Sequence, residues 1–158
     1  MTEFEKLFNE NRDFIFKYLM KMTRDSSLSE ELTQETFFRA YMNYASLRDK
    51  DKASAWLCQI AKNTYFAWFN EQKKTDSLDE MEAVSDNKDI EETFAQKELS
   101  KKALTCLHRL DEPYKEVFML SVFGGFSLKD ISSLFGKSES WARVTFYRAK
   151  QKLLEEMR

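Results

Sequence analysis

The chain has few of the residues that interrupt helices and few of those that build covalent or metal-bound frameworks. Its 158 residues include three glycines and one proline, a composition that favours helices. Two isolated cysteines, Cys58 and Cys106, and a single histidine provide neither a zinc-ligand pattern nor a disulfide framework. We therefore predict an all-α protein that holds no metal and needs no cofactor.

Long apolar runs are also missing. No stretch approaches the roughly 20 residues that cross a bilayer, and the chain begins MTEFEKLFNENRD, which lacks the features of a signal peptide. These absences predict a cytoplasmic protein. The sequence also has no glycine-rich phosphate loop and no nucleophile–base arrangement. Neither an enzyme nor a protein with a small-molecule substrate is expected.

Charge is distributed unevenly along the chain, although the net charge is only −2. Residues 1–74 carry twelve Lys or Arg against eleven Asp or Glu, residues 75–98 carry two against nine, and residues 99–158 carry eleven against seven. The basic excess therefore lies in the C-terminal part. Because neutralisation of phosphates supplies most non-specific affinity for DNA, we expect this chain to need a larger partner to hold it on DNA.

The stretch GFSLKDISSLFGKSESWARVTFYRAKQKLL predicts two helices joined by a tight turn. Ser127 and Ser138 are candidate N-caps, and Gly136 is the residue expected to end the first helix. On the second helix Ala142, Phe146, Ala149 and Leu153 form an inward stripe. A second helix that is basic on its outer side is typical of a helix-turn-helix. A helical hairpin with a solvated charged face is the alternative.

The pattern of apolar and acidic residues divides the chain into three segments. Residues 1–74 predict a helical domain, with amphipathic helices over about 4–22, from near Ser29 to Tyr44, and over about 53–74. Residues 75–93 are rich in Asp, Glu and Ser and predict an acidic flexible linker. Residues 94–158 predict a second helical domain of about four helices, which ends in the helix-turn-helix. The fold prediction is thus two small helical domains joined by a linker.

The order of these parts resembles the extracytoplasmic-function (ECF) sigma factors of bacterial RNA polymerase. SEELTQETFFRAYMNY and AWLCQIAKNTYFAWF are similar to the family's second conserved region, and LDEPYKEVFMLSVFGGFSLKDISSLFGKSESWARVTFYRAKQKL is similar to its fourth. The resemblance implies a protein that binds core RNA polymerase, recognises the −10 and −35 promoter elements and promotes strand opening. It also implies an anti-sigma factor as partner, often membrane-anchored in this family.

The resemblance also implies three groups of site residues. Those for the duplex −35 element are Ser140, Arg143, Val144, Thr145, Tyr147, Arg148 and Lys150. Those for the melted −10 element are Leu47, Arg48, Asp49, Lys50 and Asp51 in a loop, with Lys62 and Asn63 on the following helix. Those for the polymerase clamp are Glu31, Gln34, Glu35 and Arg39. The chain departs from the usual family pattern at Cys58, Gln59, Ala67 and Asn70.

Two other classes of protein fit parts of the sequence. A stand-alone helix-turn-helix regulator would bind its duplex without polymerase, and its N-terminal half would serve dimerisation or ligand binding. A helical adaptor, such as a sigma-sequestering partner, would bind only protein. The acidic linker has two interpretations, a segment that lies in a basic channel of the polymerase or a solvated tether.

Overall fold

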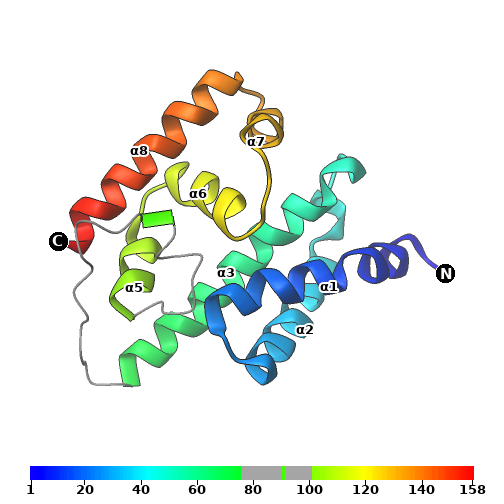
Figure 1. Cartoon of the computed structure of the whole chain (residues 1–158). Coiled ribbons are helices and arrows are strands. Elements are labelled where there is room, and N and C mark those ends of the chain that lie inside the picture. The colour runs from blue at the N-terminus through cyan, green and yellow to red at the C-terminus, as the bar shows by residue number, and fades with distance from the viewer. Residues whose placement is uncertain (76–89, 92–100) are drawn as a thin grey trace. The chain divides into compact units, whose positions relative to one another are not determined.

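The computed structural model describes residues 1–75, 90–91 and 101–158. The chain divides into two compact units, residues 1–75 and 76–158. Figure 1 shows helices throughout the described residues, and these residues contain no strand. The all-α prediction is confirmed for this part of the chain. Residues 76–89 and 92–93 of the expected linker lie outside the described residues, as do residues 94–100 of the expected next helix.

The first unit is a bundle of three helices, α1 (Glu3–Thr23), α2 (Ser26–Met42) and α3 (Ala53–Thr75), each of which packs on the other two. Helix α1 begins with a capping box. The Thr2 hydroxyl accepts a hydrogen bond from the Glu5 amide at 3.1 Å, and the Glu5 carboxylate accepts one from the Thr2 amide at 2.8 Å. Ile15, Tyr18 and Leu19 are fully buried, so this helix supplies much of the bundle core.

Helix α2 begins at Ser26, three residues before the predicted start near Ser29. The Asp25 carboxylate caps it by accepting a hydrogen bond from the Leu28 amide at 3.1 Å. Ser29 is instead buried in the first turns, where its hydroxyl lies 2.6 Å from that of Thr23. Both Asp and Ser are good N-caps, and the aspartate that comes first in the chain caps this helix.

The side of α2 that faces the bundle carries apolar residues, as expected of an amphipathic helix. Leu32, Phe37 and Ala40 are buried. Tyr41 meets the Phe4 ring of α1 edge-on at 5.2 Å yet remains 62% exposed. Its position at the margin of the bundle leaves most of the ring in solvent.

A connection with two short 3₁₀ helices, η1 (Tyr44–Ser46) and η2 (Lys50–Lys52), joins α2 to α3. Leu47, which lies between these two short helices, is buried. Just beyond the connection, near the start of α3, the Ser54 hydroxyl donates to the Asn11 side-chain oxygen at 2.7 Å, and the Asn11 amide donates to the Leu7 carbonyl at 2.9 Å. The connection is therefore attached to the bundle in its middle and where it meets α3.

Four aromatic residues lie close together on α3, and three of them are in the bundle core: the four are Tyr65, Phe66, Trp68 and Phe69. Tyr65, Phe66 and Phe69 are buried, and the rings of Tyr65 and Phe69 stack at 5.8 Å. Burial raises the pKa of the Tyr65 phenol well above its usual value. Core packing therefore accounts for these three rings, and Trp68 alone of the four aromatics is half-buried.

The second unit contains α5 (Lys101–Arg109), α6 (Tyr114–Val122), α7 (Leu128–Phe135) and α8 (Glu139–Met157). Helix α8 packs on the other three and forms the centre of the unit. Val117, Phe118, Ile131 and Ala149 are fully buried in this core. Residues 90–91, which we placed in the linker, are helical, and Ile90 is buried.

Candidate nucleic-acid and polymerase interfaces

Helices α7 and α8 form the helix-turn-helix that the sequence predicts. The Ser127 hydroxyl accepts from the Asp130 amide at 3.0 Å, and the Ser138 hydroxyl accepts from the Trp141 amide at 3.0 Å. Gly136 ends α7 in the left-handed region with φ of 65°, a conformation that strains other residues. Local chemistry therefore fixes both ends of the turn.

The two helices of this motif are also joined by side chains. The rings of Phe135 on α7 and Trp141 on α8 lie 5.2 Å apart. The Lys137 ammonium lies over the Trp141 ring at 5.9 Å. Trp141 thus stabilises the angle between the helices, and the outer side of α8 is held in a fixed orientation relative to α7.

Helix α8 separates a buried side from an exposed one. Ala142, Ala149 and Leu153 are fully buried. The exposed side carries Ser140, Arg143, Val144, Tyr147 and Arg148. Val144 and Tyr147 are 43% and 59% exposed, unusual values for large apolar side chains in a small unit. Two arginines beside two exposed apolar groups suit base edges and thymine methyls in a major groove.

Two of the residues expected at the −35 element are less accessible than the others. Thr145 is only 5% exposed, because it lies on the inward side of the helix. Lys150 is half-buried, and its ammonium lies 2.7 Å from a carboxylate oxygen of Glu91. Thr145 is therefore not presented to DNA, and Lys150 is already engaged.

The loop expected at the −10 element presents polar side chains to solvent. Arg48, Asp49, Lys50 and Asp51 are exposed, and Leu47 is buried. The Asp49 carboxylate accepts from the Asp51 amide at 3.0 Å and so caps η2. Part of the charge in this loop therefore serves its own fold.

Lys50 is held by two neighbours in the first unit, one of which packs on a third. Its ammonium lies 4.0 Å from the centroid of the Tyr44 ring and 3.9 Å from a carboxylate oxygen of Glu3. The Phe4 ring meets Tyr44 edge-on at 5.4 Å. The tip of the loop is thus attached to the start of α1 by cation–π and aromatic contacts.

The two residues expected on α3 for the −10 element have opposite environments. Asn63 is exposed, so its amide is free to offer a donor and an acceptor to a base edge. Lys62 is 3% exposed. Lys62 is therefore not accessible to DNA in this conformation, and we leave Lys62, Leu47 and Thr145 out of the interfaces proposed below.

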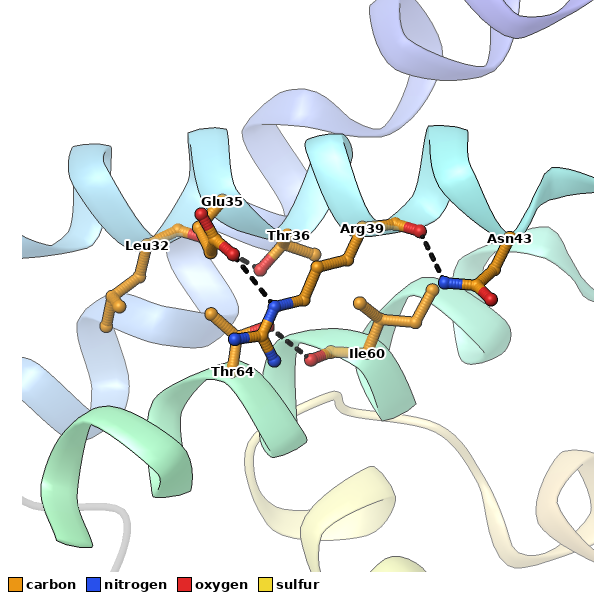
Figure 2. Close-up of polar contacts among 7 residues, drawn as sticks. All are labelled: Leu32, Glu35, Thr36, Arg39, Asn43, Ile60 and Thr64. Carbon is orange, nitrogen blue, oxygen red and sulfur yellow. Dashed lines mark hydrogen bonds and ion pairs between the residues drawn. The ribbon is translucent and has the colours of Figure 1, made fainter. Parts of the chain in front are cut away.

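The four residues expected at the polymerase lie on the outer side of α2. Glu31, Gln34 and Glu35 are exposed, and Arg39 is half-buried. Figure 2 shows Arg39 directed along α2 toward Glu35, and the Arg39 guanidinium donates to the Glu35 carboxylate at 2.9 Å. In the same view Thr36 and Thr64 bond to carbonyls of their own helices. Their hydroxyls are therefore satisfied internally.

A shallow hollow between α2 and α3 adjoins this face. The side chains that line it are Glu31, Leu32, Glu35, Arg39, Thr64, Ala67, Trp68 and Glu71. The lining includes three carboxylates, one guanidinium and the half-buried ring of Trp68. The hollow is acidic overall, which suits a basic or apolar group of another protein.

Three apolar residues on α2 are exposed, and the sequence interpretation assigned none of them to an interface: Phe38, Tyr41 and Met42. Phe38 follows Gln34 by four residues and Met42 follows Phe38 by four, so they continue the stripe that begins at Glu31. That spacing was readable in the sequence. Apolar side chains that are 61–66% exposed on one helix make this surface a candidate for contact with another protein.

The described residues show neither a metal cluster nor a membrane-spanning helix. In residues 1–75, 90–91 and 101–158, no group of three or more His, Cys, Asp or Glu side chains is arranged so that it could hold a metal ion. Within the same ranges no helix combines the length and hydropathy that a bilayer crossing needs.

Comparison with known proteins identifies a family for each of the two units. The family models "Sigma-70 region 2" and "Sigma-70, region 4" match residues 7–75 and 100–153. The chain is 30% identical to the ECF RNA polymerase sigma factor SigM of Bacillus subtilis over 141 residues, which are 88% of this chain and 85% of SigM. It is 28% identical to the RNA polymerase sigma factor SigZ of the same organism, over 94% of this chain and 84% of SigZ.

A solved structure has the same fold. The sigma factor RpoE of Bartonella quintana, crystallised with the anti-sigma factor NepR, superposes with a TM-score of 0.53 at 15% identity, over 99% of this chain and 97% of that one. The two family models match one unit each, in the order that a sigma factor requires, and the relatives align over nearly their whole length. The chain belongs to the ECF sigma factors, the promoter-recognising subunits of bacterial RNA polymerase.

Proposed function

We propose a division of labour between the two units. The first, residues 1–74, docks on the clamp of core polymerase and reads the −10 element as single strands. The second, residues 94–158, reads the −35 element as duplex, and the acidic segment 75–93 joins them. The single observation that supports this best is the pair of outward faces, one apolar and acidic on α2 and one basic on α8.

The −35 element is read by the exposed side of α8. Arg143 and Arg148 project from it and suit bidentate contacts with guanine, each worth about 1–3 kcal/mol of discrimination. Val144 and Tyr147 offer apolar contact to thymine methyls. Ser140, one residue inside the N-terminus of α8, and the backbone amides there suit phosphate. Arg143 must first leave Glu139, whose carboxylate lies 3.3 Å away on the exposed surface.

The −10 element is read by the exposed loop and Asn63. Arg48 and Lys50 supply positive charge toward the displaced strand, and Asn63 supplies a base-reading amide. Extruding a base costs a few kcal/mol, which its new contacts must offset. The attachment of Lys50 to Tyr44 and Glu3 reduces the motion of the loop before DNA arrives.

Core polymerase is bound by the outer stripe of α2. Glu31, Gln34 and Glu35 supply the polar contacts, and Phe38 and Met42 supply the apolar area. Arg39 orients Glu35. The catalysis in transcription belongs to the polymerase, and we assign no separate reaction and no cofactor to this chain.

An anti-sigma factor is the second protein partner that we propose. The structural relative RpoE of Bartonella quintana was crystallised with such a protein. The exposed apolar residues of α2 give an inhibitor a surface that polymerase also needs, so the two would compete. Because bacterial promoters are in the cytoplasm, we propose that the protein acts there.

Run-off transcription with purified core polymerase tests the proposal. The chain should direct initiation from a subset of a promoter library, and it should bind duplex DNA only weakly before polymerase is added. Arg148→Ala should lose promoter choice while polymerase binding persists, whereas the exposed Lys17→Ala, which removes a positive charge from α1, should behave as wild type. A chain that neither binds polymerase nor redirects initiation would contradict the proposal.

A further inference from the structure

Lys150 is the least accessible basic residue on the DNA-facing side of α8. It follows Arg143 by seven residues, two helical turns, so both lie on the same side of the helix. Its side chain is 27% exposed, whereas that of Arg143 is 62% exposed. A lysine placed for phosphate is thus partly withdrawn from the surface.

Two neighbours hold the Lys150 ammonium. The Glu91 carboxylate accepts its hydrogen bond at 2.7 Å, a short, charge-assisted contact. The Phe146 ring lies beneath it at 5.0 Å. Ile90, the residue before Glu91, is buried, and this anchors the backbone that presents the carboxylate.

We propose that Glu91 masks a DNA-binding lysine, as an autoinhibitory contact within the second unit. The inference rests on the proposed binding of DNA by α8. A carboxylate in contact with the ammonium takes the place that a DNA phosphate oxygen would take. The sequence adds to the argument, because Glu91 comes from the acidic segment 75–98, whose nine acidic residues precede a basic stretch with a net charge of +4. The pair keeps the second unit from binding duplex DNA indiscriminately.

The masking has a quantitative consequence. Each phosphate that a lysine neutralises adds about 0.9 to the slope of log K against log salt. Freeing Lys150 should therefore steepen the salt dependence by about that amount. Breaking the partly exposed Glu91–Lys150 ion pair releases the lysine for a DNA phosphate. The affinity for duplex DNA at low salt should therefore rise by about two- to fivefold.

The experiment measures anisotropy of a labelled 20-base-pair random duplex with the full chain, across a range of KCl concentrations. A random sequence suffices because phosphate contacts do not depend on base sequence. The test variant is Glu91→Gln, which keeps the side-chain shape. The control is Glu156→Gln, which removes the same charge from an exposed position on α8. Circular dichroism of both variants establishes that the helices are intact.

We expect Glu91→Gln to bind more tightly than Glu156→Gln and with a steeper salt slope. Lys150→Ala should change binding little in the wild-type chain and should weaken it several-fold in the Glu91→Gln chain. Equal binding by the two glutamine variants would overturn the masking. So would an equal loss on Lys150→Ala in both backgrounds, since the lysine would then already be free.

The same assay separates this inference from the proposed function. Because each substitution removes a positive charge from the exposed side of α8, Arg143→Ala and Arg148→Ala should each weaken binding of the random duplex, whatever residue 91 is. If they do not, the assignment of α8 as the DNA-reading helix fails, and the masking fails with it. If the arginine variants weaken binding while Glu91→Gln matches its control, only the masking is wrong.

Discussion

Phe37 and Phe38 are adjacent on α2 and have opposite environments. Phe37 is 4% exposed and its ring meets that of Phe8 edge-on at 4.9 Å, whereas Phe38 is 61% exposed. The same substitution at the two positions should therefore separate folding from polymerase binding. Phe37→Ala should lower the free energy of unfolding by about 3–5 kcal/mol. Phe38→Ala should change it by less than about 0.5 kcal/mol.

The expected loss of polymerase affinity follows from the exposed area of Phe38. An aromatic side chain has about 150–250 Å² to bury, of which 61% is still available on Phe38. Burying roughly 90–150 Å² at about 25 cal/mol per Å² is worth about 2–4 kcal/mol as an upper bound. Part of this free energy is offset by the entropy lost on association. We therefore expect Phe38→Ala to lose about 2 kcal/mol of binding free energy, or roughly 30-fold in Kd.

The assay pairs thermal unfolding with titration of labelled chain against core polymerase. Phe38→Ala should keep the wild-type Tm and lose affinity. The reasoning about α2 would be refuted if Phe38→Ala bound polymerase as wild type does, or if it destabilised the fold as much as Phe37→Ala.

Other perturbations test the remaining contacts. Ser138→Ala removes the cap of α8 and should cost about 1 kcal/mol of stability, measured by urea unfolding; an unchanged midpoint would show that the cap contributes nothing. Asn63→Ala should impair open-complex formation more than −35 duplex binding; normal permanganate reactivity of the −10 region would count against its role. Glu35→Lys reverses a charge on the outer stripe of α2 and should weaken polymerase binding in a pull-down. If the variant recovers as much polymerase as wild type does, Glu35 is not part of the interface. Arg148→Lys should reduce base discrimination by about 1–3 kcal/mol because lysine lacks the planar fork; undiminished promoter choice would argue against bidentate contact.

Local chemistry explains why the helix-turn-helix was predictable. Ser127, Gly136 and Ser138 determine the two caps and the turn through contacts that span only a few residues. Ala142, Ala149 and Leu153 recur with the period of an α-helix, so a helix places all three on one side, and that side is buried. The residues of α8 that lie opposite this stripe were therefore expected to be exposed.

Non-local contacts explain what the sequence could not predict. Glu91 and Lys150 are 59 residues apart, and no pattern pairs them. The burial of Lys62, Leu47 and Thr145 depends on which neighbours pack over each residue, whereas periodicity tells only which side of a helix a residue occupies. The start of α2 was misplaced for a different reason, because Asp25 and Ser29 were both suitable caps.

The connection between α2 and α3 has an evolutionary consequence. Leu47, in the middle of the connection, and the Asn11–Ser54 hydrogen bond just beyond it attach this segment to the bundle. Between them Asp49 caps η2 and Lys50 contacts Tyr44 and Glu3, whereas the side chains of Arg48 and Asp51 are exposed. On the proposed role of this loop, exchanging Arg48 and Asp51 for the residues of a paralogue should change promoter preference without loss of folding, so that new preferences arise at a few positions while the bundle stays intact.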